Sequence, residues 1–172
     1  NPSMMLLSGK PQNVSGSCVA CIMEGSRPIL AEVQALVTKT GFGTPRRTAA
    51  GFDYHRMNLL LAVLEKRAGY CFSALDVYLN VVGGLRLDEP AADLPVAVAL
   101  VSSLRDKPVD DELIAFGEIG LGGELRSVHN IAERVREAQR LGFTRAIVPR
   151  SSLPLLQKQG VWEIELLPAA NL

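Results

Sequence analysis

The sequence is poor in aromatic residues, carries no net charge and contains no long apolar run. Phe, Trp and Tyr make up 5% of the 172 residues, and 18 Lys and Arg balance 18 Asp and Glu. No apolar run approaches the about 20 residues that a membrane-spanning helix needs. A net charge of zero argues against indiscriminate binding to nucleic acid or to anionic membranes. We therefore expect a globular protein without a membrane partner.

Cysteine is also scarce, and its odd count of three suits a reducing cytoplasm better than a disulfide framework. Cys18 and Cys21 form a C-x-x-C pair. Zinc would need two further ligands, and only Cys71, His55 and His129 are available, without a second pair. Both cysteines of the pair also lie in the apolar strand pattern SCVACIME. The sequence therefore predicts buried, small hydrophobic residues here and no metal site.

The chain lacks the G-x-x-x-x-G-K-[ST] loop that cradles phosphates, so we expect no ATP site and no other cofactor within these residues. Its length suits one domain with a substantial core. It begins at Asn1, without a methionine or a signal-like region. We expect a piece of a longer protein, with 1–13 as the lead-in from a preceding domain and 14–172 as the domain itself.

What is present predicts an α+β domain with a mixed sheet. Strands at 17–24 and 29–38 form an antiparallel hairpin around the turn 25–28. A glycine-rich loop covers 39–52, and Asp53 caps a helix over 54–68 that Gly69 ends. The later expected elements are a strand at 113–118, a helix at 131–141 with an Asn130–Glu133 capping box, a strand at 144–148, one or two helical turns at 151–157 and a strand at 161–166.

The centre of the chain runs from Asp76 to Arg105. It predicts a buried strand that ends at Gly83-Gly84, a loop, and a helix that Asp93 caps, with proline in the first turn. Every position from Leu94 to Val101 is apolar. A helix without a polar side is covered all round, so this should be the core helix. Its N-terminus is where backbone amides can gather around a negative charge.

The stretches DEPAADLPVAVALVSSLR and FGEIGLGGELRSVHNIAERVREAQRLG resemble the Lon protease-like domain family. Within that family, the resemblance is greatest to the C-terminal domain of the RadA (Sms) group of bacterial DNA-repair proteins. It begins with NPS at the start of the chain and continues through SGSCV, EGSRPILAEVQALV, FGTPRR and NLLLAVLEKRAG, so the likeness runs over nearly the whole chain. The resemblance implies the Lon protease-like (ribosomal protein S5 domain 2-like) fold, with an N-terminal β-hairpin followed by βαβ units on a mixed sheet.

Peptidases of the Lon family use a serine at the start of the core helix and a lysine just inside the later helix. The hydroxyl needs an adjacent base, and the amides at the helix start stabilise the oxyanion. The resemblance places Ala91 and Ala132 at these two positions. It also places Glu89 and Asp93 where the peptidases have glycines, and these carboxylates would repel a developing anion. We therefore expect no catalytic residue and no Lon-type peptidase activity.

A displaced peptidase site is the enzymatic alternative. Ser102 lies near the C-terminal end of the core helix with Lys107 close behind, but the helix dipole disfavours an alkoxide there. Ser127 and His129 stand two apart in an extended stretch, with Asp93 as a conceivable third member. A Ser-x-His pair is a weak motif on its own, and a polar loop is the simpler interpretation.

Arginine outnumbers lysine 13 to 5, and arginine is the better residue for bidentate phosphate contacts. One basic group lies in the glycine-rich loop and the helix after it. The other, with Arg134, occupies the solvent side of helix 131–141, where interleaved glutamates support the alternative of a solvated face. The residues that we predict to bind DNA are Arg46, Arg47, Arg56, Arg136 and Arg140.

For the whole protein, the resemblance implies an ATP-driven DNA motor in DNA repair and recombination. ATP and magnesium would bind in its motor domain and zinc in an N-terminal finger, both outside this chain. The partners would be other copies in a homo-oligomeric, hexameric ring, DNA, and a RecA-type recombinase. The Lon-like domain of magnesium-chelatase-like ATPases is a further alternative, because it shares the D-L-P-[IV]-A stretch, although we expect it to lack the NPS and PRR segments.

Overall fold

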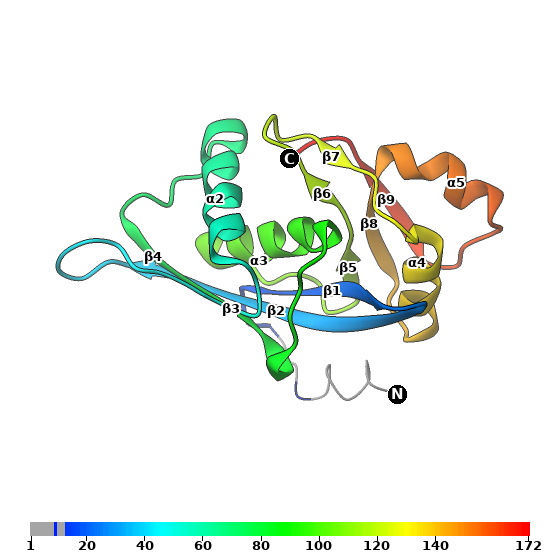
Figure 1. The fold of residues 1–172 in the computed structure, drawn as a ribbon, viewed down its shortest axis with the longest axis horizontal. Helices are drawn as coiled ribbons and strands as arrows, with labels where there is room; N and C mark the ends of the chain where they lie inside the picture. The colour runs from blue at the N-terminus through cyan, green and yellow to red at the C-terminus, as the bar shows by residue number, and fades with distance from the viewer. Residues whose placement is uncertain (1–8, 10–12) are drawn as a thin grey trace.

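A mixed seven-stranded sheet organises the chain, in a computed structural model that describes residue 9 and residues 13–172. The strand order is β3-β4-β2-β1-β5-β8-β9. Helices α2 and α3 cover one face of its first half, and α4 and α5 lie at the other end (Figure 1). The predicted α+β class is confirmed. The expected lead-in, 1–13, lies almost entirely outside the described residues.

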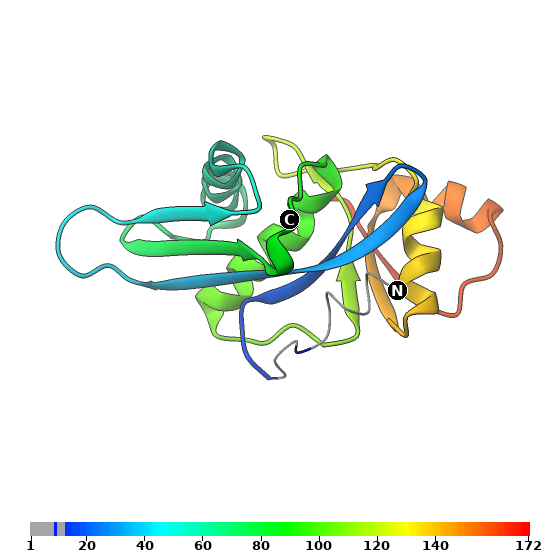
Figure 2. The same cartoon turned by 60° about the horizontal axis from the view of Figure 1, so that its bottom comes forward.

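The predicted hairpin is confirmed as β1 (Ser17–Glu24) and β2 (Arg27–Lys39), which pair antiparallel. Side chains alternate between the two faces of a strand. Cys18, Ala20 and Ile22 face the core under α3, whereas Val19 and Cys21 face the second core, under α4. The hairpin is therefore buried on both faces where the two cores overlap. Beyond that region β2 projects away from the body of the molecule toward the β2–β3 loop (Figure 2).

The helix predicted after Asp53 is confirmed as α2 (Tyr54–Ala68). The Asp53 side chain accepts a hydrogen bond from the Arg56 amide over 2.9 Å, and Gly69 ends the helix in the left-handed conformation at φ 79°. The sequence predicts a loop throughout residues 39–52. The structure instead has a short edge strand there, β3 (Arg47–Ala50), because it pairs in parallel with β4 (Leu75–Val81).

The core helix is α3 (Asp93–Arg105), which packs across β1 and β2. Most of its side chains are buried, which confirms it as the core helix, although Val98 and Val101 are only partly buried. Two 3₁₀ turns precede it, at Val82–Gly84 and Pro90–Ala92. Ser102 and Ser103 anchor its far end to the sheet, because their hydroxyls accept the amides of Gly16 (2.8 Å) and Val37 (2.9 Å).

The second half contains β5 (Leu113–Ala115), β8 (Arg145–Pro149) and β9 (Glu165–Ala169), all parallel. The strand expected at 113–118 is split, because β6 (Glu118–Ile119) leaves the sheet to pair with β7 (Leu125–Arg126). The last strand also begins later than predicted. A 3₁₀ turn at Arg150–Ser152 leads into the short helix α5 (Leu153–Lys158). No helix among the described residues is long and apolar enough to span a membrane.

The helix after β7 is α4 (Ile131–Arg140). The capping box predicted for it is wrong. Asn130 adopts a left-handed conformation, with φ 58° and ψ 36°, and its side chain makes no capping hydrogen bond. With this backbone, its side chain is not directed at the free amides of the first turn.

Candidate functional site

The start of α3 faces a pocket of about 370 Å³. Ala91, which the resemblance predicts to stand at the nucleophile position, lies on its wall. Glu89, Arg134, Ser127 and His129 also line it. The pocket therefore brings together residues from the loop before α3, the segment after β7 and the helix α4.

An ion pair between Glu89 and Arg134 crosses this pocket. The Arg134 guanidinium donates to Glu89 Oε1 over 2.6 Å, to the carbonyl of Cys21 over 2.7 Å and to the carbonyl of His129 over 2.8 Å. Glu89 Oε2 accepts the amide of Met23 over 2.6 Å. Only 4% of the Arg134 side chain is exposed, against 26% for Glu89. The guanidinium thus has an acceptor on each of its three nitrogens, and it ties the loop before α3 to β1 and α4.

The placement of Arg134 on the solvent side of α4 is wrong. The residue stands at the third position after Ile131 and just before Val135, within the stripe that faces the sheet. The 3.6-residue period itself carried this signal, because positions i, i+3 and i+4 share one helix face. The charge of the arginine favours the solvent face, but its position in that period favours the buried one.

Ala91 and Ala132 are both buried, each with 3% of its surface exposed. Neither methyl side chain can act as a nucleophile or a base. The Ala91 carbonyl accepts the amide of Gly117 over 3.3 Å, which fixes the start of α3 against the end of β5. The two positions are therefore packed as ordinary core residues.

The prediction that Asp93 caps α3 is wrong. Ala92 is the capping residue, and Asp93 is the first helical residue, with 1% of its surface exposed. Its carboxylate forms an ion pair with Arg56 and accepts the amide of Ile119 over 3.0 Å. The hydrogen bond that the Arg56 guanidinium donates to the Asp93 carboxylate raises the pKa of Arg56. The pair joins α2, α3 and β6 at the edge of a second pocket, of about 320 Å³.

Ser127 and His129 do not assemble a triad with Asp93. The Ser127 hydroxyl lies 2.6 Å from that of Ser151, at the surface. The hydrogen bonds that the Asp93 carboxylate forms among the described residues join it to Arg56 and the Ile119 amide. These three residues therefore do not form the serine-to-base-to-carboxylate relay that this mechanism requires.

The first arginine group is not one continuous basic surface. Arg56 is paired with Asp93, as above. The Arg47 guanidinium donates to the carbonyls of Leu75 and Phe72, the latter over 2.9 Å, and is partly buried. Arg46 is exposed, and its backbone amide, not its side chain, donates to Asp76 Oδ1 over 2.7 Å. Arg46 is the member of the group that faces solvent.

The second group keeps two exposed members on α4. Arg140 donates to both carboxylate oxygens of Glu137 over 2.8 Å. Its charge is thus balanced by a glutamate of the same helix, as expected for a solvated face. The Arg136 guanidinium lies 5.5 Å from the centre of the Trp162 ring, a cation–π contact. Arg136 is therefore exposed but oriented by an aromatic ring.

Cys18 and Cys21 are buried in β1, as predicted. Burial raises the pKa of the Cys21 thiol to about 12, so the thiolate that zinc needs is strongly disfavoured. No group of three or more potential metal ligands occurs within residue 9 and residues 13–172.

One exposed aromatic residue is not indicated by any of the sequence patterns above. Phe42 lies at the tip of the β2–β3 loop and is fully exposed. The sequence does place this aromatic residue between two glycines, where it has no apolar neighbour in the chain to pack against, and this pattern could have indicated its exposure.

Comparison with known proteins gives two results. Residues 53–152, more than half of the chain, match the family model described as subunit ChlI of Mg-chelatase. The chain is 52% identical over 153 residues to DNA repair protein RadA of Streptococcus pneumoniae, covering 89% of this chain and 36% of that protein. It is 50% identical to RadA of Halalkalibacterium halodurans over 153 residues (89% and 34%), and 49% identical to RadA of Synechocystis sp. over 150 residues (87% and 30%). The chain thus spans about a third of the length of the curated relatives it matches.

Proposed function

We propose a role in DNA repair for this chain, which belongs to the family described as subunit ChlI of Mg-chelatase and is the Lon protease-like domain of RadA-type proteins. In this proposal the domain is not a peptidase. It is the oligomerisation scaffold and DNA-binding platform of a RadA-type repair and recombination ATPase. The observation that carries the proposal is an identity of about 50% to proteins named DNA repair protein RadA along 87–89% of the chain.

The pocket at the start of α3 supports a role without peptide hydrolysis. Acyl transfer needs an activated nucleophile and donors aimed at a developing oxyanion. Ala91 supplies no nucleophile, and the Glu89 carboxylate stands in the same pocket, where it disfavours a second negative charge. The Arg134 guanidinium, which could otherwise stabilise an anion, is fully engaged with Glu89 and two carbonyls. The contacts of Arg134 in this pocket therefore serve to hold β1, the loop before α3 and α4 together.

A ring of copies would reconcile DNA binding with a protomer of zero net charge. Repetition of one exposed basic position around a closed ring places several cations along one track. Arg46 is the best placed of the predicted DNA contacts, because its guanidinium has no ion-pair partner among the described residues. We assign Arg136 and Arg140 a secondary role. Arg47 and Arg56 act chiefly by holding the fold beside the contact.

The remaining features belong to the whole protein. We propose that ATP and magnesium act in a motor domain and zinc in a finger, both outside this chain. A RecA-type recombinase would be met by the whole protein in the cytoplasm. Residues 1–13 would connect this domain to the preceding one.

The Mg-chelatase-like ATPases offer a second candidate, because the ChlI model matches residues 53–152. That match leaves out the β1–β2 hairpin and the β2–β3 loop, whereas the similarity to RadA extends over 89% of the chain. The loop that carries Arg46 is therefore the discriminating segment. Under the Mg-chelatase alternative, Arg46 has no reason to affect DNA binding.

The test measures the mass in solution by light scattering and the DNA affinity across a salt series, on the same sample of this chain. We expect a mass above that of a monomer and a logarithm of affinity that falls linearly with the logarithm of salt concentration. A strict monomer at high concentration counts against the scaffold, and an absence of DNA binding counts against the platform. Turnover of an unstructured protein, abolished by Ser127→Ala or Ser102→Ala, would instead establish a displaced peptidase site.

A further inference from the structure

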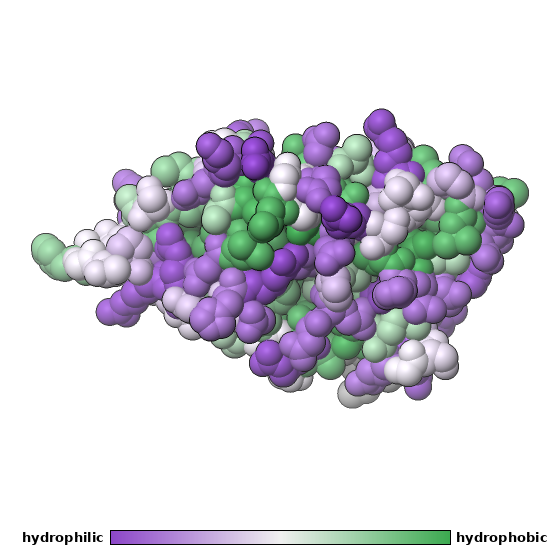
Figure 3. Space-filling view, turned by 45° about the horizontal axis from the view of Figure 1, so that its top comes forward, coloured by the Kyte–Doolittle hydropathy of each residue, from purple (hydrophilic) through white to green (hydrophobic). Residues whose placement is uncertain are grey.

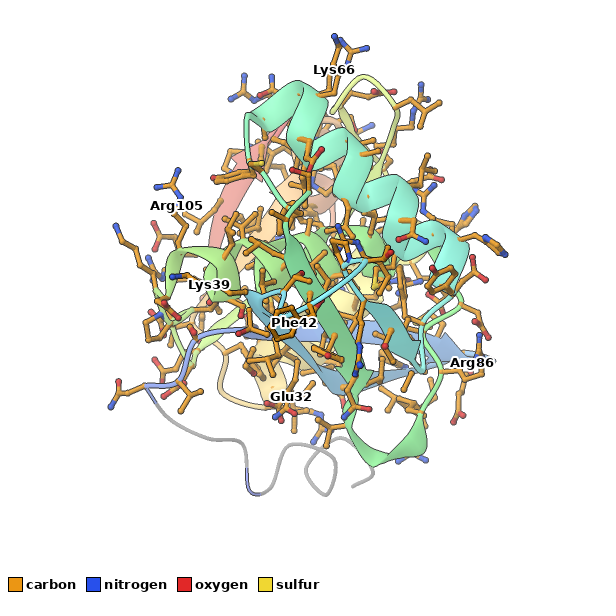
Figure 4. All side chains as sticks on the ribbon, turned by 90° about the vertical axis from the view of Figure 1, so that its left-hand side faces the viewer. Glu32, Lys39, Phe42, Lys66, Arg86 and Arg105 are labelled. Atoms are coloured by element: carbon orange, nitrogen blue, oxygen red, sulfur yellow. The ribbon has the colours of Figure 1, made fainter. Side chains whose placement is uncertain are left out.

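The β2–β3 loop presents one aromatic side chain at the far end of the molecule. The loop follows Lys39 and ends at Arg47, and it projects beyond the body of the domain (Figures 1 and 2). Phe42, near its middle, is fully exposed. Figure 3 shows hydrophobic colour at this tip, apart from the other hydrophobic areas of that face. Figure 4 looks onto the tip, with Phe42 in front and Lys39 to one side.

The base of the loop is fixed although its tip is open. One oxygen of the Asp76 carboxylate accepts both the Thr40 hydroxyl (2.9 Å) and the Arg46 amide (2.7 Å), so it ties the two ends of the loop to β4. Between them, a Cβ added at Gly41 or Gly43 would meet nothing within 4 Å. The aromatic ring is therefore held out from the domain on an anchored stem and packs against none of the described residues.

The charge around the tip is positive. Lys39 and Arg46 are exposed, and Arg47 sits at the loop base with its guanidinium on neutral carbonyls. The ion pairs between described residues include none of these three cations. Asp76 supplies one negative charge against them. An occupant of this tip should consequently combine a flat apolar face with negative charge.

We propose that Phe42 stacks on a base of single-stranded nucleic acid while Lys39 and Arg46 contact the flanking phosphates. This inference rests on the proposed DNA-binding function and makes it more specific. Stacking on an aromatic side chain beside a basic track is the general mode of single-strand binding, because every base has a π-face and every linkage a phosphate. The bases of a duplex are already stacked on one another, so a lone ring on a stem would gain little from it. A surface of another copy of this chain is the competing occupant.

The test compares Phe42→Ala with the unaltered chain on two strands of equal length, oligo(dT) and an abasic strand with the same phosphates. We expect the substitution to lower affinity for oligo(dT) by about 5- to 150-fold, the usual effect of removing one stacked aromatic. Affinity for the abasic strand should stay within about twofold, because its phosphates are unchanged. Val161→Ala is the matched control, since Val161 is 98% exposed and lies in the loop before β9, at the opposite end of the domain. It should alter neither affinity.

Three results would overturn the inference. If Phe42→Ala leaves oligo(dT) binding unchanged while salt-dependent binding persists, stacking is wrong and the DNA platform survives. If the unaltered chain binds neither strand, the DNA-binding proposal fails as well. If Phe42→Ala reduces the mass in solution but not DNA affinity, the tip contacts another copy of the chain. A Phe42→Trp variant adds a direct readout: its extra fluorescence should be quenched by oligo(dT) and not by the abasic strand.

Discussion

Arg134 and Glu89 form a 2.6 Å ion pair inside the pocket at the start of α3, although they lie 45 positions apart in the sequence. Arg134 is almost fully buried, so its charge depends on this carboxylate and on two backbone carbonyls. A buried pair can contribute little net stability compared with an apolar replacement, but removal of one partner leaves the other charge uncompensated. The pair therefore locks the arrangement of β1, α3 and α4.

Glu89→Gln should lower the free energy of unfolding by about 2–3 kcal/mol, because it leaves the Arg134 guanidinium without its counterion. The partial exposure of Glu89 keeps the loss below that of a fully buried partner. Each oxygen of Glu89 accepts one hydrogen bond, from Arg134 or from the Met23 amide, so the NH₂ group of the new amide must face one of these two donors. Urea denaturation of the two proteins measures the difference.

Asp88→Asn is the matched control for that experiment, since it removes a neighbouring carboxylate from an exposed pair with Arg86. We expect a change within about 0.5 kcal/mol, as for most surface ion pairs. Equal losses for the two variants would mean that the Glu89–Arg134 pair is no more important than a surface contact.

The elements whose pattern is local could be predicted from the sequence. The unbroken apolar run of α3 required burial on all sides, and Asp53 and Gly69 marked the ends of α2 through capping chemistry. Strand β3 could not be found in this way. It is four residues long, and it exists because β4, almost 30 residues later, offers it a parallel edge. Such pairing depends on which strand the fold brings alongside, so the sequence of the short segment alone does not reveal it.

The site was harder to predict than the fold for the same reason. Arg46 and Arg47 are adjacent and chemically identical, yet the pairing of β3 with β4 turns Arg47 toward the carbonyls of Phe72 and Leu75 and leaves Arg46 in solvent. Asp93 reads as an ideal cap until α2 supplies Arg56 as its partner. Charged residues in a sequence show which interactions are possible, and tertiary contacts select among them.

Alanine substitution should consequently affect folding stability at Arg47 and DNA binding at Arg46. Arg47→Ala should cost about 2 kcal/mol of folding stability, because two partly buried carbonyls lose a charged donor. Arg46→Ala should leave stability within about 0.5 kcal/mol and reduce the salt slope of DNA binding by about 0.7–0.9, the share of one phosphate contact. Urea denaturation and affinity across a salt series measure the two effects. An unchanged slope for Arg46→Ala would remove this residue from the DNA contact.

The three cysteines should differ in reactivity. Cys71 is exposed, and its hydrogen bond with Ser73 lowers the pKa of the thiol, whereas burial raises the pKa of Cys21 to about 12. The thiolate is the reactive form. Iodoacetamide at about pH 8 should therefore alkylate only Cys71 in the folded protein and all three cysteines in urea, as counted by mass spectrometry. The variant Cys71→Ser should remain unmodified until it unfolds. Rapid modification of Cys18 or Cys21 in the folded chain would contradict the burial of β1.

Asp76 should make the stability of the β2–β3 loop depend on acid pH. The hydrogen bond from the Arg46 amide lowers the pKa of this carboxyl below its ordinary value of 3.8, and the Thr40 hydroxyl acts in the same direction. A group whose pKa is depressed by folding stabilises the folded state above its unfolded-state pKa, and that contribution is lost as the pH falls through the folded-state pKa. Asp76→Asn should therefore flatten the fall in unfolding free energy below about pH 4. Thr40→Val, which removes one donor only, should give an intermediate slope. Urea denaturation across this pH range is the measurement, and identical slopes for Asp76→Asn and the unaltered chain would show that Asp76 does not hold the stem on which Phe42 is carried.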